Sequence, residues 1–308
     1  MDVLSIVLPV LLLIGIGVLC RSARLLSHEG VNSIKQLVMK IMLPVAIFQA
    51  LGTATYSMRT IAIVALVLGG VLLTFFAGFL LRFLFKPPYK KYLPFLVCLY
   101  EGGMVGYPLY VSLCGTDQLS NIALLDVACL LFGFGVYMSL LQQAETGERL
   151  SVKMLAKSAL TSPTFIATVL GIIVGATGLL NWLIGSSFGE VYTSLQTMVT
   201  SGLSALILIV IGYEFHPTLR LIGPCFKTIA CRILLQAMLA VALIFLLRTL
   251  FGENHMLDIA IIMLMASPAP FSMQSYLKTE EGGEYVSTFN SIYCIFTVAV
   301  YVVLAFFV

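Results

Sequence analysis

The chain has 308 residues, of which 60% are hydrophobic and 10% are charged, and its formal net charge is +3. A mean hydropathy of +1.06 excludes a soluble globular protein of this length, because water would not solvate such a surface. The small charge surplus also argues against nucleic-acid binding. The seven cysteines are scattered and never form a CxxC pair, so neither a disulfide framework nor a zinc site is expected.

Apolar stretches long enough to cross a bilayer recur along the whole chain. A transmembrane helix needs about 20 apolar residues, and this length predicts about ten spans joined by short connections. The first span follows Met1 and Asp2 without the basic start of a cleaved signal peptide, so it is expected to be retained. The predicted spans cover residues 4–23, 31–51, 61–85, 92–115, 122–141, 163–183, 192–213, 226–251, 257–277 and 285–308.

The distribution of lysine and arginine predicts the orientation of these spans. The even-numbered connections contain only Arg59 and Arg248, whereas the other connections are rich in basic residues. By the positive-inside rule, the odd-numbered connections face the cytoplasm and both termini lie outside. The basic residues in or beside the odd-numbered connections are Arg21, Arg24, Lys35, Arg82, Lys86, Lys90, Lys91, Arg149, Lys153, Lys157, Arg220, Lys227 and Lys278.

The fourth predicted span contains a stretch that does not suit a lipid-facing helix. Residues 99–115 read LYEGGMVGYPLYVSLCG and combine a carboxylate, Glu101, with several glycines and a proline. Pro108 has no N–H and its ring crowds the carbonyl of Met104, so a break is expected near residues 105–107. Backbone groups freed in hydrocarbon must face protein or a water-filled cavity, so the stretch predicts a binding site.

Two pairs of proline-containing segments indicate an internal repeat. The ninth predicted span contains Ser267-Pro268-Ala269-Pro270, in a position that matches Pro108 of the fourth. Pro9 with Gly17 is similarly echoed by Pro163 with Gly171 at the start of the second half. This pattern predicts an all-α polytopic membrane protein with two inverted five-helix repeats, residues 1–150 and 151–308, forming one membrane unit. The alternative is that these prolines only kink their helices.

Several motifs, in this order, resemble the auxin efflux carrier family. They are LPVLLLIGIGVLCRSARLLSHEG at residues 8–30, IMLPVAIFQAL at 41–51, GYPL at 106–109, IGYEF at 211–215 and SPAPFSMQSYL at 267–277. The family includes the plant PIN carriers and bacterial permeases of small organic acids, within the bile acid, auxin and arsenite transporter superfamily. The resemblance covers nearly the whole chain.

The resemblance implies a sodium/proton-antiporter-like fold of ten helices, with broken helices 4 and 9 that cross, and an elevator-type movement. Family members with an NTGFLGYP-like motif would place an asparagine where this chain has Glu101. The corresponding asparagine of the ninth helix is matched by Gln274, which preserves an amide. The family's usual ligand contact is therefore altered at Glu101.

Glu101 is the first candidate for chemistry, either as a proton carrier, as a contact to a cationic group, or as a structurally paired acid. Asp126 is a second proton-coupling candidate; alternatively it bonds a freed backbone group or lies near the outer interface. Arg232 either binds a substrate carboxylate or pairs with Glu214. Pro44 is expected to disrupt the second span, beside the cavity. The predicted substrate-binding residues are Glu101, Gly103, Met104, Val105, Gly106, Pro108, Pro44, Ser201, Ser204, Ser267, Pro268, Pro270 and Gln274.

These features predict a secondary active transporter of the plasma membrane that moves a small organic anion, such as a dicarboxylate or an auxin-like acid, by alternating access. No P-loop is present, so the expected energy source is an H⁺ or Na⁺ gradient or substrate exchange. Without GxGD or HExxH sequences, an intramembrane enzyme is not expected, and no cofactor or metal is predicted. The expected partners are the substrate, lipid and a second copy in a homodimer. The alternatives are a receptor or sensor, or a carrier of a neutral or cationic metabolite.

Overall fold

A computed structural model describes residues 3–147, 151–215 and 217–308, and these residues form helices without any strand. Seven of the described helices are long and apolar enough to cross a membrane, or up to eight if one bent pair forms a single span. The expected fourth and ninth spans are instead broken into short helices. The chain is therefore a multi-pass helical membrane protein, while the count of ten spans stays a prediction. Arg149, one of the basic residues used for topology, lies outside the described residues.

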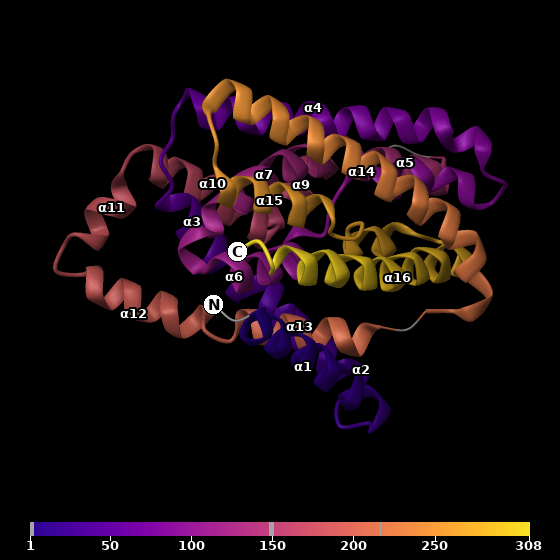
Figure 1. Cartoon of the computed structure of the whole chain (residues 1–308), viewed down its shortest axis with the longest axis horizontal. Coiled ribbons are helices and arrows are strands. Elements are labelled where there is room, and N and C mark those ends of the chain that lie inside the picture. Colours follow the sequence, from indigo (N-terminus) through magenta and orange to yellow (C-terminus); the bar gives the residue numbers. More distant parts are fainter. Residues whose placement is uncertain (1–2, 148–150, 216) are drawn as a thin grey trace.

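The helices follow the predicted spans closely in sequence. The first part contains α1 (Val3–Ser22), α2 (His28–Leu37), α3 (Leu43–Gly52), α4 (Met58–Leu81), α5 (Leu93–Cys98), α6 (Tyr107–Cys114), α7 (Leu119–Phe132) and α8 (Met138–Thr146). The second part contains α9 (Val152–Thr161), α10 (Pro163–Ala176), α11 (Leu179–Ile184), α12 (Gly189–Thr200), α13 (Leu203–Glu214), α14 (Ile222–Phe251), α15 (His255–Met265) and α16 (Glu280–Leu304). In Figure 1, α5, α6, α7 and α15 lie in the interior, with α4 and α14 on one side and α1 and α13 on the other.

Polar caps fix where several of these helices begin. Ser162 Oγ accepts a hydrogen bond from Phe165 N at the start of α10, and Asn254 Oδ1 accepts one from Leu257 N at the start of α15. Thr279 Oγ1 does the same for Gly282 N at the start of α16. Each cap satisfies an N–H that the helix itself leaves free, so the connections can stay short.

Pro44 and Pro108 do not interrupt the helical segments that contain them. Residues 38–42 form a π-helical turn that joins α2 to α3, so Pro44 lies in a continuous helical run. Residues 102–106 form a second π-helical turn that leads into α6 and Pro108. The expectation of a break near residues 105–107 is therefore wrong. The wider turn shifts the hydrogen-bond pairing, and the chain is instead non-helical at residues 99–101.

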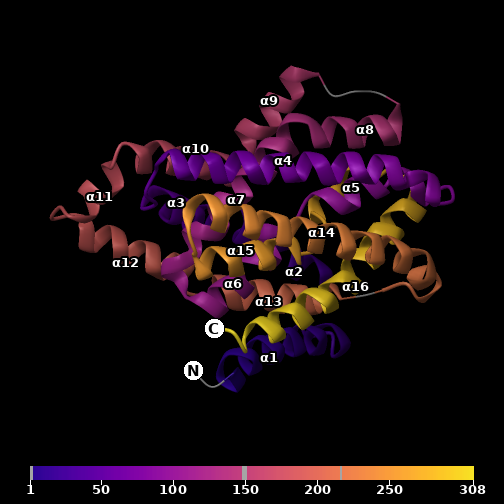
Figure 2. The same cartoon turned by 45° about the horizontal axis from the view of Figure 1, so that its top comes forward.

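The connections gather at two opposite ends of the helices. At one end, Arg21 Nη1 donates to Tyr213 O at 3.0 Å, Tyr89 hydroxyl donates to Glu281 Oε1 at 2.9 Å, and Lys227 Nζ donates to Leu84 O at 2.6 Å. These bonds join segments in or next to four of the predicted connections, namely the first, third, seventh and ninth, which all lie on the predicted cytoplasmic side. At the other end, His255 Nε2 lies 3.0 Å from Phe307 O, and the beginning of α1 lies near the end of α16 in Figures 1 and 2, where the Tyr301 hydroxyl donates to Ile6 O.

The first predicted span of each half packs against the second predicted span of the other half. α1 packs along α13, and α10 packs along α3. Glycines permit both crossings: a methyl group at Gly17 would lie 2.1 Å from Ile209 O, and one at Gly175 would lie 2.4 Å from Leu51 O. Backbones at this separation leave no room for a side chain, so van der Waals contact holds the helices together.

This close approach predicts that Gly17→Ala lowers the melting temperature of the detergent-solubilised protein, with a loss of about 1–3 kcal/mol from overpacking. Gly15→Ala is the matched control on the same helix, because a methyl group there meets nothing within 4 Å. The control is expected to melt at or above the wild-type temperature, since alanine favours helix more than glycine does. Equal melting temperatures for the two variants would contradict the packing argument.

Candidate functional site

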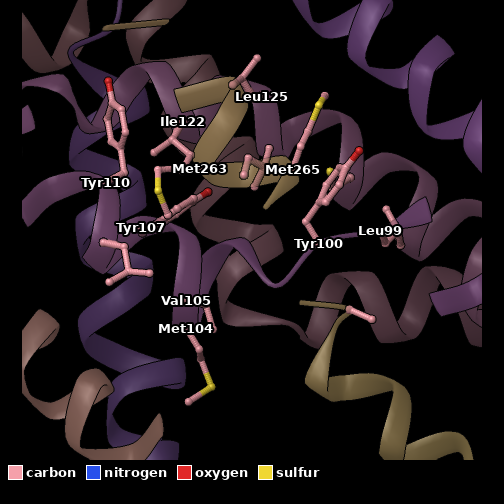
Figure 3. Close-up of a cluster of buried hydrophobic side chains, with 14 of the residues drawn as sticks. Leu99, Tyr100, Met104, Val105, Tyr107, Tyr110, Ile122, Leu125, Met263 and Met265 are labelled. Carbon is pink, nitrogen blue, oxygen red and sulfur yellow. The ribbon is translucent and has the colours of Figure 1, made fainter. Parts of the chain in front are cut away.

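The two broken helices meet at their non-helical segments. α5 ends at Cys98 and the chain resumes helical form at Gly102, while α15 ends at Met265 and a 3₁₀-helical segment begins at Phe271. Glu101 N donates to Pro268 O at 2.8 Å, so one backbone hydrogen bond joins the two breaks directly. Figure 3 shows Tyr107 and Ile122 gathered beside Met263, which packs the segments that follow and precede these breaks. The predicted pairing of the two proline-containing segments is therefore a physical contact.

The Glu101 carboxylate binds backbone N–H groups at the beginning of the helical segment that follows each break. Its Oε1 accepts a hydrogen bond from Met104 N at 3.3 Å, and its Oε2 accepts one from Phe271 N at 2.7 Å. The side chain is buried. Free backbone N–H groups at the start of a helical segment attract an anion, and here the protein's own carboxylate fills that role. The site expected to receive a substrate carboxylate already contains one.

Arg232 of α14 binds backbone carbonyl groups that are freed where α5 and α15 end, on the other side of the two breaks. Its Nη2 donates to Leu99 O at 2.9 Å and to Ser267 O at 2.7 Å, and its Nη1 donates to Leu96 O. Arg232 is fully buried. A guanidinium suits this place because helix C-termini carry partial negative charge and its five N–H donors can serve several carbonyls. The expected pairing of Arg232 with Glu214 is not formed, because Glu214 pairs with Lys35 at 2.7 Å, while the binding of a substrate carboxylate by Arg232 stays a prediction.

A neighbouring glutamine extends this support. Gln236, one turn after Arg232 on α14, donates through its Nε2 to Val97 O and accepts a hydrogen bond from the Tyr100 hydroxyl at 2.7 Å. On the other side, the Thr297 hydroxyl of α16 donates to Ala266 O at 2.6 Å. Side chains from α14 and α16 thus satisfy carbonyl groups from both breaks, as a hydrocarbon environment requires.

A cavity of about 380 Å³ opens beside Glu101. Charged groups reach it from three elements: Glu101, Asp126 of α7 and Lys35 of α2. Most of its remaining wall is apolar or aromatic, including Leu43, Ile47, Leu99, Met104, Leu130, Phe134, Tyr137 and Phe271. A cavity of this size with a few polar groups on one side is typical of a site for a small molecule. Within the described ranges, no three His, Cys, Asp or Glu residues form a candidate metal cluster.

Asp126 is held by a tyrosine and not by a freed backbone group. Its Oδ2 accepts a hydrogen bond from the Tyr107 hydroxyl at 2.9 Å, and the residue is buried. A methyl group at Gly102 would lie 2.9 Å from the same oxygen, so the glycine is needed for this approach. Asp126 therefore lines the cavity beside Gly102, the residue that follows Glu101.

The other predicted substrate-binding residues divide into three groups. Gly103, Met104 and Pro270 line the cavity with Glu101. Val105, Gly106, Pro108, Ser267 and Pro268 are buried within the crossing itself. Pro44, Ser201, Ser204 and Gln274 lie elsewhere: Pro44 lines an apolar groove between α3, α10 and α12, Gln274 lines a second cavity, and Ser201 is exposed with its hydroxyl bonded to Met198 O. Their role in binding stays a prediction.

Lys35 lines the cavity, although the sequence predicted it only as one of the basic residues on the cytoplasmic side. It lies inside the second predicted span, and that placement was the available signal, because a lysine within a span needs a partner or a water-filled space. Its Nζ bonds Glu214 at 2.7 Å and lies 5.8 Å from the centre of the Phe271 ring. The cation therefore reaches the cavity wall that Phe271 shares with Glu101.

A helical protein with membrane-length apolar helices and a polar cavity where two broken helices cross is, by class, a polytopic membrane transport protein. A profile of the family described as membrane transport protein matches residues 2–308, which is nearly the whole chain. The chain belongs to this family, which includes the auxin efflux carriers, and the resemblance is confirmed. The family is one of transporters and not of enzymes. No curated protein matches the sequence.

The position of Arg232 predicts a large loss of stability for Arg232→Met. Methionine preserves the length of the side chain but leaves several buried carbonyl groups without a donor, at a cost of about 2–5 kcal/mol in total. Arg220→Met is the control, since Arg220 forms an exposed ion pair with Glu284 and its loss should cost less than about 1 kcal/mol. Thermal unfolding in detergent measures both, and similar melting temperatures for the two variants would refute this role.

Proposed function

We propose that the protein is a proton-coupled secondary active transporter of small organic anions. The observation that carries this proposal is the Glu101 carboxylate, which lies between Met104 N and Phe271 N and also lines the cavity. While it is ionised, it occupies the N–H groups that a substrate carboxylate would need, and it repels that substrate. When it takes up a proton, the repulsion ends and the N–H groups become available.

Binding of the anion and of the proton is thereby mutually dependent. The charged groups that face Glu101 are Asp126, which adds negative charge, and Lys35, whose charge is shared with Glu214. An extra anion in this cavity would be strongly unfavourable unless a proton accompanied it, because few compensating charges are near. Proton uptake by Glu101 supplies that compensation, so one proton accompanies each monoanion.

The side chains that line the cavity favour a substrate with one polar end and one apolar end. Freed N–H groups and Lys35 lie on one side, while Leu43, Ile47 and Phe134 supply an apolar surface. This combination suits a molecule with one carboxylate and an apolar or aromatic body that fits within about 380 Å³. The substrate class we favour is therefore an amphipathic monocarboxylic acid, and a more hydrophilic dicarboxylate fits these walls less well.

A second candidate function is supported by the two carboxylates, Glu101 and Asp126, that face the same cavity. If both stay ionised, a cationic metabolite would be attracted to them. A receptor or sensor on the same scaffold would bind a ligand without moving it. The experiments below separate these functions from the proposed one.

Alternating access requires two parts that move relative to each other, and we propose that the halves 1–150 and 151–308 supply them as inverted repeats. Support comes from the reciprocal packing of α1 on α13 and α10 on α3, with Gly17 and Gly175 at the contacts. An elevator-type movement, residence in the plasma membrane, termini on the outer side and a homodimer belong to the same proposal. Coupling to Na⁺ is the alternative to coupling to protons.

The proposal predicts that Glu101→Gln abolishes accumulation driven by a pH gradient while counter-substrate exchange continues, because glutamine carries no titratable proton. Uptake of radiolabelled 3-phenylpropanoate into proteoliposomes measures both. Asp126→Asn is the matched control, and it should keep its gradient dependence because an amide oxygen still accepts the Tyr107 hydrogen bond. Gradient-driven uptake that survives in Glu101→Gln, or that is lost only in Asp126→Asn, would exclude Glu101 as the coupling residue.

Equilibrium binding gives an independent prediction about pH. Affinity for 3-phenylpropanoate should rise as the pH falls, by up to about tenfold per pH unit where one proton is taken up with each anion. Titration calorimetry of the purified protein at acidic and neutral pH measures this slope, and Glu101→Gln should flatten it. Affinity that rises with pH, or preferential binding of an organic amine, would favour the cation carrier. Binding without any flux in vesicles would favour the sensor.

A further inference from the structure

Helix α9 connects the fifth and sixth predicted spans on the predicted cytoplasmic side. It is bent by 77° from α10, the apolar helix that follows it. Because α10 belongs to a predicted span, a bend of this size turns α9 toward the plane of the membrane. In Figure 2, α9 lies at the edge of the molecule, beyond α8 and α10. We propose that α9 is an interfacial helix that binds the headgroups of anionic phospholipids, independently of the function assigned to the cavity beside Glu101.

One face of α9 packs on the rest of the protein. Ala159 is buried, and Leu155 and Ser158 are half-buried. The helix contacts α10 and the π-helical turn at residues 133–137. These contacts fix the rotation of α9 about its axis, and so they decide which side chains point away from the protein.

The outer face of α9 carries an apolar row and a basic row side by side. Val152, Ala156 and Leu160 recur every four residues and are exposed, Val152 by 82% and Leu160 by 68%. Lys153 and Lys157 are also exposed, and they lie about one turn apart next to the apolar row. This arrangement is typical of a helix that lies in the membrane surface, with its apolar side chains among the lipid chains and its lysines at the phosphates.

The charge of this segment favours an anionic lipid over a neutral one. Residues 149–189 contain no Asp or Glu, so the segment supplies no acidic partner for Lys153 or Lys157. None of the ion pairs among the described residues involves either lysine, whereas Lys35 and Lys91 both pair with glutamates. Lysines beside a bilayer attract the negative charge of anionic headgroups. A phospholipid with an anionic headgroup therefore matches both rows of α9, through its chains and through its phosphate.

The test places a fluorescent probe on the apolar row. Leu160→Trp in a Trp182→Phe background leaves a single tryptophan, since the sequence contains only one. The full chain is reconstituted into vesicles in which either the phosphatidylglycerol or the phosphatidylcholine has brominated chains, and quenching is measured as the brominated fraction rises. We expect phosphatidylglycerol to bind near residue 160 about tenfold more strongly than phosphatidylcholine, and this ratio should fall toward one at high salt.

Two double variants, made on the probe protein, separate the charge of the lysines from other effects. Lys153→Gln with Lys157→Gln should remove the preference for phosphatidylglycerol. Lys153→Arg with Lys157→Arg is the matched control and should keep it, because arginine carries the same charge. Both lysines are exposed, so neither double variant should change the melting temperature of the probe protein.

Three results would overturn the proposal. The first is equal quenching by the two brominated lipids, and the second is a preference that survives the glutamine substitutions. The third is a Leu160→Trp probe that neither lipid quenches, because α9 would then lie outside the bilayer surface. None of these measurements involves uptake of 3-phenylpropanoate, so their outcome is separate from that of the proposed transport function.

Discussion

The structure depends on how the backbone groups freed by two broken helices are satisfied inside the membrane. Water is not available there, so each freed carbonyl and N–H needs a protein partner. Arg232 bonds carbonyl groups of both breaks, at Leu99 and Ser267, and Glu101 bonds N–H groups of both, at Met104 and Phe271. Each charged side chain therefore joins one half of the chain to the other. The crossing behaves as one unit because neither break is satisfied without residues from the opposite half.

The two charged residues differ in what they can do. Arg232 is fully buried, and it is not among the residues that line the cavity. Its guanidinium holds the freed carbonyl groups together. Glu101 faces the cavity and belongs to a residue type that exchanges protons, so its hydrogen bonds to Met104 and Phe271 can change in strength. The same arrangement thus combines a fixed structural cation with an adjustable anion.

The sequence predicted the crossing but not its details. Glycines and a proline in the first segment and two prolines in the second indicated the breaks, and a carboxylate inside an apolar run indicated Glu101. The position of the first break could not be predicted, because a π-helical turn absorbs Pro108 and moves the break to residues 99–101. The bonds from Arg232 to the freed carbonyl groups could not be predicted either, because these partners lie far from Arg232 along the chain. Gln274 follows the second break, but the motif does not tell which cavity its side chain faces.

The charges near the crossing also bear on the proposed transport of a proton together with an anion. The positive charge of Arg232 is directed at the freed carbonyl groups that it binds. Lys35 is paired with Glu214, and Asp126 accepts a hydrogen bond from Tyr107. Little positive charge is left to hold an additional carboxylate beside an ionised Glu101. If a monoanion enters as Glu101 takes up a proton, the total charge of the buried region stays constant. The region then gains no further uncompensated charge when the substrate enters, and added charge is what burial in an apolar environment penalises most.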